Sequence, residues 1–134
     1  VYKRQVCDWF CIKVLAPLIQ QEGEPCARRI SEWHQAPVLW QARASLVPFT
    51  KVADDRQYYL LVEVSCATLI RRHERFAKTA VGWILRDISK HDSRFVEKVI
   101  HDNLAHFSGE SLRNATKYFD GDQRKRYLEA LRNA

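Results

Sequence analysis

Three residues of this 134-residue sequence interrupt apolar helical patterns with groups that could do chemistry. At 100° of rotation per residue, the carboxylate of Asp8 falls on an apolar stripe, and so does the guanidinium of Arg43. The indole of Trp83 lies at the edge of a third stripe, beside a strip of basic residues. Burying a charge is costly unless the charge is paired or used. Together these groups could hold a cationic base against a phosphate backbone.

The spacing of the three residues suggests that they share one groove. Asp8 and Arg43 are 35 positions apart, and Arg43 and Trp83 are 40 positions apart. Both separations are close to the period of repeats built from a pair of helices. Equivalent faces of successive repeats line a common surface, so we expect the three side chains to face the same groove.

Each residue also has a purely structural interpretation. Asp8 lies four residues after Arg4 and could form an ion pair along one helix. Arg43 could extend its head group to water or cap a neighbouring carbonyl, and Trp83 could be a core residue. The basic runs at 71–75 and 124–126 are typical of solvated helix surfaces. The other tryptophans are predicted to pack in the core: Trp9, Trp33 and Trp40.

The elements that must position these residues are helices. Apolar residues recur at helical spacing almost throughout, and period-2 alternation is nearly absent. We predict an all-α fold of stacked antiparallel helix pairs, a HEAT/armadillo-like superhelix with about eight helices. The expected spans are 2–21, 25–35, 37–50, 55–71, 74–90, 93–106, 109–118 and 122–132.

Several helix boundaries have a chemical reason. Pro17 and Pro48 fall late in helical patterns and should kink or end their helices. Other residues suit the beginnings of helices. Pro25 and Pro37 suit a first turn, Asp92 and Ser108 can act as N-caps, and 120–122 form a turn before a new helix.

Composition limits the class of protein. The formal net charge of +6 and the pI near 9.3 favour a polyanionic partner, and no apolar run approaches the length that spans a bilayer. Residues 1–134 are expected to form a single domain, and because the chain contains no methionine we expect it to be part of a longer protein. The cysteines form no CxxC pair and should be small buried residues in a reducing compartment: Cys7, Cys11, Cys26 and Cys66.

Three segments resemble the AlkD-type DNA alkylation repair glycosylases, which are built from HEAT-like repeats. Cys7–Leu15, followed by Ala16, is similar to the Asp-bearing helix of that family. The segment from Trp33 through Trp40 to Arg43-Ala44 resembles its W…W..RRA pattern. The longest match, 78–87 followed by 89–92, resembles its K-A-I-G-W-x-L-R-E…K-x-D/N-P signature.

The resemblance implies a monofunctional glycosylase that excises N3- or N7-alkylated purines from duplex DNA without a metal or cofactor. It also implies that residues 1–134 are the C-terminal part of a longer protein, because they match only the latter part of a family member. By it, Asp8 corresponds to the catalytic carboxylate, Arg43 to an arginine that contacts the DNA backbone, and Trp83 to an aromatic residue of the lesion cleft. We further predict backbone contacts from the basic strip: Arg75, Lys78, Arg86 and Lys90. A monomer in the bacterial cytoplasm, at the nucleoid, or in a eukaryotic nucleus is expected.

One position departs from the family pattern. Family glycosylases place a tryptophan one turn before the catalytic carboxylate, where this chain has Arg4. A cation in place of an aromatic ring should weaken cation–π stabilisation of a charged base. Two other functions therefore stay open: a non-catalytic DNA-binding relative, and a HEAT-type scaffold whose groove holds an acidic peptide.

Overall fold

The computed structural model describes residues 2–134, which are helical and contain no β-strand. A long first helix comprises α1 (Tyr2–Phe10), a π-helical turn (Cys11–Leu15) and α2 (Ala16–Glu22). The elements that follow are α3 (Glu24–Ser31) with a 3-10 turn (Glu32–Gln35), α4 (Leu39–Arg43), two 3-10 segments (Val47–Val52 and Arg56–Tyr58), α5 (Tyr59–Leu69), α6 (Arg75–Ser89), α7 (Ser93–Asn103) with a 3-10 turn (Leu104–His106), α8 (Gly109–Ala115) and α9 (Gly121–Arg132).

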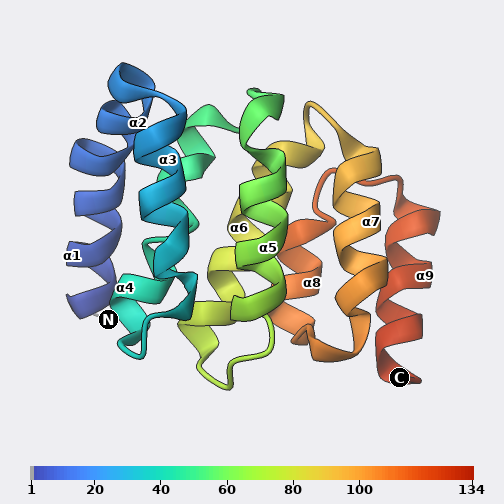
Figure 1. The fold of residues 1–134 in the computed structure, drawn as a ribbon. Coiled ribbons are helices and arrows are strands. Elements are labelled where there is room, and N and C mark those ends of the chain that lie inside the picture. The colour runs from blue at the N-terminus through green and yellow to red at the C-terminus, as the bar shows by residue number, and fades with distance from the viewer. Residues whose placement is uncertain (1) are drawn as a thin grey trace.

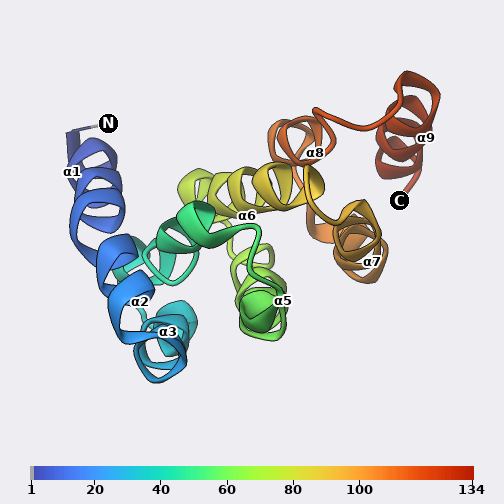
Figure 2. The same cartoon turned by 90° about the horizontal axis from the view of Figure 1, so that it is seen from above.

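The helices are stacked as pairs along one direction (Figure 1). Seen from above, α3, α5 and α7 lie on one side of the molecule, whereas α1, α6 and α8 lie on the other (Figure 2). Helix α6 contacts α4, α5, α7 and α8, so it is the central element of the stack. The prediction of an all-α fold of stacked helices is confirmed.

Three of the predicted helix starts are confirmed by their capping contacts. The carboxylate of Asp92 accepts a hydrogen bond from the backbone N–H of Phe95, and Ser108 and Ser111 cap each other reciprocally. Asp120 accepts from the N–H of Gln123 at the start of α9. These bonds satisfy N–H groups that have no partner within their own helix.

The four prolines have different outcomes. Pro25 lies in the first turn of α3 as predicted, but Pro37 lies before α4, which begins only at Leu39. The helix expected over 37–50 ends at Arg43, and Pro48 lies in the following 3-10 segment. At Pro17 the chain stays helical with a π turn before it, in which the N–H of Ala16 donates to the carbonyl of Cys11. The wider turn accommodates a residue that cannot donate its own N–H.

The apolar stripe of α6, at whose edge Trp83 lies, is part of the core. Its buried positions are Ala77, Ala80, Val81, Gly82, Ile84, Leu85 and Ile88. Cys11 and Cys66 are buried and Cys7 and Cys26 half-buried, and none of the four forms a disulfide within the described part of the chain. Burial raises the pKa of the Cys66 thiol, as expected for a residue that acts as a small apolar side chain.

Two residues depart from the predictions about core and surface: Trp9 and, alone in the run 71–75, Arg72. Trp9 is 60% exposed because it lies on the outer face of α1, a helix with no buried residue, whereas Trp33 and Trp40 are half-buried. Arg72, in a run predicted to be solvated, donates hydrogen bonds to the carbonyls of Ala36 and Pro37 and to the carboxylate of Glu74. It therefore fixes the loop that precedes α4.

Gly82 allows α8 to approach α6 closely, and we expect its replacement by alanine to destabilise the fold. An added Cβ would lie 2.8 Å from the carbonyl oxygen of Ser111 and 3.1 Å from Cβ of Asn114. Overpacking against backbone costs about 1–3 kcal/mol, which the gain in helix propensity of about 1 kcal/mol offsets only in part. Urea denaturation of Gly82→Ala should therefore show a net loss of up to about 2 kcal/mol.

Gly121→Ala is the matched control for this measurement. A Cβ at Gly121 has no heavy atom within 4 Å, and its φ is not positive. We expect this variant to unfold at the wild-type urea concentration or above it. Equal stabilities of the two variants would contradict the close packing of α6 on α8.

Candidate functional site

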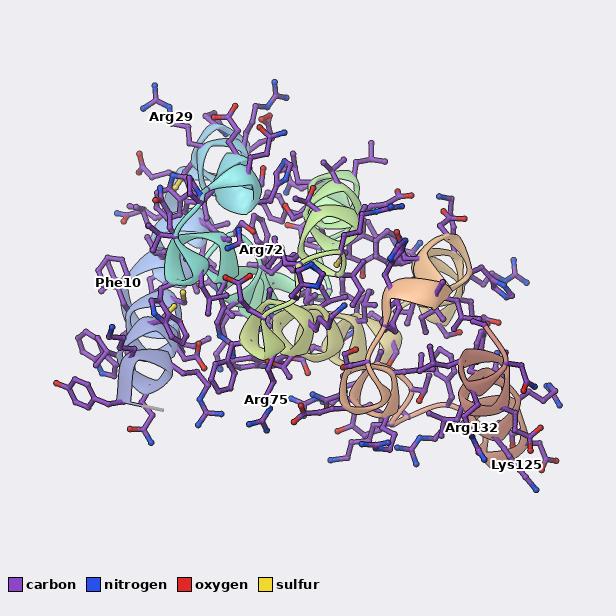
Figure 3. The ribbon with its side chains drawn as sticks, turned by 90° about the horizontal axis from the view of Figure 1, so that it is seen from below. Phe10, Arg29, Arg72, Arg75, Lys125 and Arg132 are labelled. Carbon is purple, nitrogen blue, oxygen red and sulfur yellow. The ribbon has the colours of Figure 1, made fainter. Side chains whose placement is uncertain are left out.

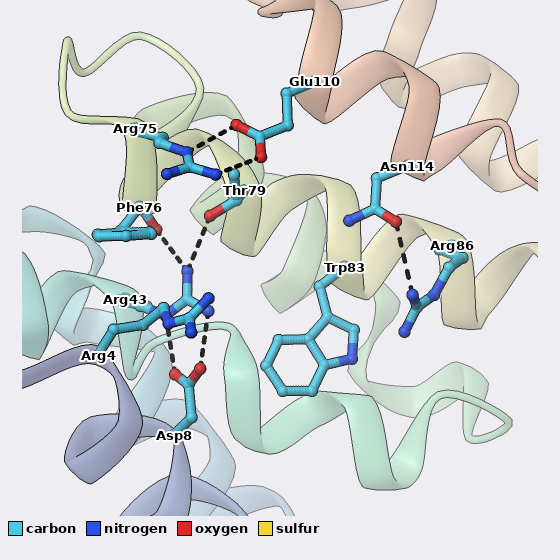
Figure 4. Close-up of a pocket in the computed structure, with 10 residues that line it drawn as sticks. All are labelled: Arg4, Asp8, Arg43, Arg75, Phe76, Thr79, Trp83, Arg86, Glu110 and Asn114. Carbon is cyan, nitrogen blue, oxygen red and sulfur yellow. Dashed lines mark hydrogen bonds and ion pairs between the residues drawn. The ribbon is translucent and has the colours of Figure 1, made fainter. Parts of the chain in front are cut away.

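Four helices enclose a cleft of about 320 Å³ (Figure 4). Helices α1, α4, α6 and α8 contribute its walls with four arginines, two carboxylates, two aromatic rings and two small polar side chains. The lining residues are Arg4, Asp8, Arg43, Arg75, Phe76, Thr79, Trp83, Arg86, Glu110 and Asn114. The structure thus brings Asp8, Arg43 and Trp83 together in one cleft, as their spacing predicts, together with Arg75 and Arg86.

At the centre of the cleft wall, Arg43 forms a two-bond ion pair with Asp8. Nε of Arg43 donates to Oδ1 of Asp8 at 2.8 Å, and Nη2 donates to Oδ2 at 3.0 Å. Nη1 of Arg43 donates to the carbonyl of Phe76 at 2.7 Å and to Oγ1 of Thr79 at 3.1 Å. The Arg43 side chain is only 4% exposed, whereas that of Asp8 is 20% exposed. The carboxylate is therefore held in one orientation and still faces the cleft.

The structural interpretation in which Asp8 pairs with Arg4 was wrong, and the catalytic role of Asp8 stays a prediction. The ion-pair partner of Asp8 is Arg43, on another helix, and not Arg4 on the same one. The guanidinium of Arg43 lies behind the carboxylate, with its donors directed at protein oxygens. A buried guanidinium in that position orients Asp8. The contact of Arg43 with the DNA backbone stays a prediction.

The two aromatic rings of the cleft have different neighbours. The Phe76 ring has three guanidinium carbons near its centroid: Arg75 at 5.3 Å, Arg4 at 5.4 Å and Arg43 at 5.9 Å. The Trp83 ring has Arg43 at 5.9 Å and packs against the core on its other side. Trp83 is therefore both a packing residue and a wall of the cleft, and its indole is the ring with fewer cations around it.

The rim of the cleft carries a second ion pair. Arg75 donates to the carboxylate of Glu110 through Nε at 2.9 Å and Nη2 at 2.8 Å. This bonding raises the pKa of Arg75 and lowers the pKa of Glu110. Arg86 makes longer contacts, with Asp87 at 3.3 Å and Oδ1 of Asn114 at 3.5 Å. Sequence analysis missed Glu110 and Asn114, because no pattern marks them and only the approach of α8 to α6 brings them to the cleft.

Two predicted DNA contacts, Lys78 and Lys90, lie outside the cleft. Nζ of Lys78 donates to the carbonyl of Ile70 at 2.6 Å and to that of His106, and partial burial lowers the pKa of Lys78. Lys90 is exposed, with Nζ 4.9 Å from the centroid of the Tyr118 ring. Lys78 therefore joins the loop after α5 to the end of the turn that follows α7, and we assign it a structural role.

This assignment predicts that Lys78→Met loses stability without losing DNA affinity. The carbonyls of Ile70 and His106 would lose a charged donor. Each hydrogen bond to a charged group contributes about 1.5–3 kcal/mol to the free energy of unfolding. Thermal and urea denaturation, with DNA affinity measured in parallel, would test it. Lys90→Met removes the same charge from an exposed position and should leave stability unchanged. A Lys78→Met protein of wild-type stability but reduced DNA affinity would contradict the structural role.

Within residues 2–134, no cluster of three histidine, cysteine, aspartate or glutamate side chains is arranged to hold a metal ion. No helix in the same range has the length and apolar character needed to span a bilayer.

Comparison with known proteins identifies the family of the chain. The family model described as DNA alkylation repair enzyme matches residues 2–119. The match includes all four helices that line the cleft, and α9 lies outside it. No curated protein and no solved structure matches the chain. Since the family model covers most of the sequence, the chain belongs to the DNA alkylation repair enzyme family.

Proposed function

We propose that the protein binds duplex DNA and hydrolyses the N-glycosidic bond of N3- or N7-alkylated purines. The observation that carries this proposal is the carboxylate of Asp8, which Arg43 orients through two hydrogen bonds and which stays open to a cleft lined by Trp83. A fixed negative charge in an otherwise cationic cleft is suited to a reaction in which a sugar becomes positively charged.

The reaction follows from the charge of the lesion. Alkylation at N3 or N7 makes the purine cationic, so the bond from C1′ to the base breaks with its electron pair on the base. The sugar then carries positive charge, which the Asp8 carboxylate stabilises electrostatically. Of the roughly four acceptor sites on a carboxylate, Arg43 uses two. The others accept a hydrogen bond from the water whose oxygen bonds to C1′, and the proton of that water passes to bulk solvent while the alkylated base leaves as a neutral molecule.

Trp83 and the rim arginines supply binding. The indole face attracts a cationic base, and Trp83 has fewer arginines around it than Phe76. Arg75 and Arg86 stand at the cleft where a DNA strand would enter, and guanidinium groups suit phosphate oxygens. The formal net charge of +6 favours association with the polyanion.

The test is release of free base from methylated duplex DNA. The protein is incubated with the DNA, and free 7-methylguanine and 3-methyladenine are quantified against spontaneous loss in a sample without protein. Release that exceeds the spontaneous rate and grows with protein concentration supports the proposal. A folded protein that binds the DNA and releases neither base contradicts it.

One observation favours a second function, DNA binding without catalysis. Arg4 places a guanidinium over Phe76, 5.4 Å from its centroid, on a wall of the cleft that a cationic base would approach. Like charges repel, so this arrangement would disfavour the lesion in the absence of a compensating anion. Salt-dependent binding to DNA with no base release is the result that this second function predicts.

A further inference from the structure

The cleft carries positive charge that its own carboxylates do not compensate. Asp8 is paired with Arg43, and Glu110 is paired with Arg75. Arg86 has only the longer contacts to Asp87 and Asn114. Among the described residues Arg4 forms no ion pair at all. One guanidinium of the cleft therefore lacks a counter-charge.

Arg4 also has an unused donor at a buried position. Its Nε is buried and has no hydrogen-bond partner among the described residues. The guanidinium is held against the Phe76 ring, with its central carbon 5.4 Å from the ring centroid. Leaving a charged donor without an acceptor is costly. The Nη groups of Arg4 also bond to no described residue, and they are the donors that an acceptor entering the cleft would meet.

The chemistry of Arg4 indicates an oxyanion as that acceptor. The planar fork of a guanidinium matches two oxygens of a phosphate. Arg4 lies one helical turn before Asp8 and lines the same cleft, beside the Asp8–Arg43 pair (Figure 4). A phosphate bound to Arg4 would therefore lie close to the carboxylate of Asp8.

We propose that Arg4 binds a backbone phosphate of DNA in the cleft, next to Asp8. The proposal rests on the proposed function in that DNA is the ligand. The bound phosphate neutralises Arg4, so a cationic base can then enter and stack on Trp83. Arg4 thus makes the cleft receptive to a charged lesion only when a DNA strand already occupies it.

The test is the salt dependence of DNA affinity. Each neutralised phosphate contributes about 0.9 to the slope of log K against log salt. The affinity of the protein for a short duplex is measured by fluorescence anisotropy between 50 and 200 mM salt. Over this range, each phosphate contact changes the affinity roughly threefold. Arg4→Gln should lower the magnitude of the slope by about 0.9, and Arg4→Lys, which keeps the charge, should retain it.

Arg29→Gln is the control for removal of a positive charge. Arg29 is exposed on α3, on the opposite side of the molecule from Arg75 of the cleft (Figure 3). Its replacement should leave the slope unchanged. Thermal denaturation of each variant establishes that it is folded at the temperature of the binding measurement. Where Arg4→Gln is unstable, Arg4→Met, which is also uncharged, should show the same loss of slope.

A second arm asks whether a single phosphate is the ligand. Replacing one phosphate beside the lesion with an uncharged methylphosphonate should weaken binding of the wild-type protein and leave binding of Arg4→Gln unaffected. Equal slopes for Arg4→Gln and wild type, or equal methylphosphonate effects in both, would overturn the proposal. So would inorganic phosphate that binds in an Arg4-dependent manner while the DNA slope does not depend on Arg4, because the site would then serve a free anion.

The outcomes separate this inference from the proposed function. A slope that depends on Arg4 without any base release supports the phosphate contact and contradicts the glycosylase. Base release with a slope that does not depend on Arg4 supports the glycosylase and contradicts the phosphate contact.

Discussion

Replacing Asp8 with asparagine is expected to reduce the single-turnover rate of 7-methylguanine release by at least about 100-fold, because removing one fixed electrostatic stabiliser of a transition state typically costs about 10²–10³ in rate. Asparagine has nearly the same shape as aspartate but carries no charge, so it cannot stabilise the cationic sugar. It also offers one oxygen in place of two to the Arg43 fork. The measurement is free base released from methylated duplex DNA with protein in excess.

Glu110→Gln is the matched control for Asp8→Asn. Both changes neutralise a carboxylate that lines the cleft and is paired with an arginine through two bonds. Glu110 lies at the rim, so its replacement should leave the rate within a few-fold of wild type. A folded Asp8→Asn protein with wild-type release would rule out the catalytic role of Asp8. Equal losses in both variants would point to the net charge of the cleft as the cause.

Replacing Arg43 with methionine is expected to lower the free energy of unfolding by about 3 kcal/mol, the lower part of the range for breaking a buried ion pair. Methionine keeps the length of the side chain but leaves Asp8 without its partner. Since Asp8 is 20% exposed, water can solvate part of the unpaired charge, and this reduces the loss. The contacts with the carbonyl of Phe76 and with Thr79 are lost as well. Urea denaturation measures the change.

Arg28→Met is the control that isolates burial. Arg28 and Glu24 are 2.9 Å apart, nearly the separation of Arg43 and Asp8, but their side chains are 65% and 39% exposed. Exposed pairs contribute about 0–1 kcal/mol, so this variant should be close to wild type. If Arg28→Met and Arg43→Met lose equal stability, the buried pair is not a major contributor to the fold.

The double variant Asp8→Asn with Arg43→Met extends the test. Once Arg43 is absent, neutralising Asp8 no longer breaks an ion pair and removes an unpaired charge. The double variant should therefore be more stable than the sum of the two single losses implies. Additive losses would mean that the two side chains stabilise the fold independently.

The amino-acid sequence by itself determined where most of the helices lie, the exception being the one expected over 37–50, which ends at Arg43. Apolar periodicity and capping residues act within a few positions of each other, so they can be read without tertiary contacts. Asp92 and Ser108 cap helices as their positions predict, and residues 2–22 are helical nearly over the predicted span. When α1, the π turn and α2 are counted as one helix, the described residues contain eight α-helices, which agrees with the predicted count of about eight.

The same local rules identified part of the cleft. A charge or an indole on an apolar stripe is visible from the helical rotation alone, and a spacing near one repeat places it on an equivalent face. Asp8, Arg43 and Trp83 were found in this way and do line one cleft. Their roles in binding and catalysis remain predictions.

Only the tertiary structure decided which side chains touch. Helical rotation gives the direction of a side chain but not the distance to the next helix, so the pairing of Asp8 with Arg43, and not with Arg4, could not be predicted. Gly82 lets α8 approach α6, and this approach brings Glu110 and Asn114 to the cleft. Contacts between helices depend on packing across the whole core, whereas helix positions depend on neighbours in sequence.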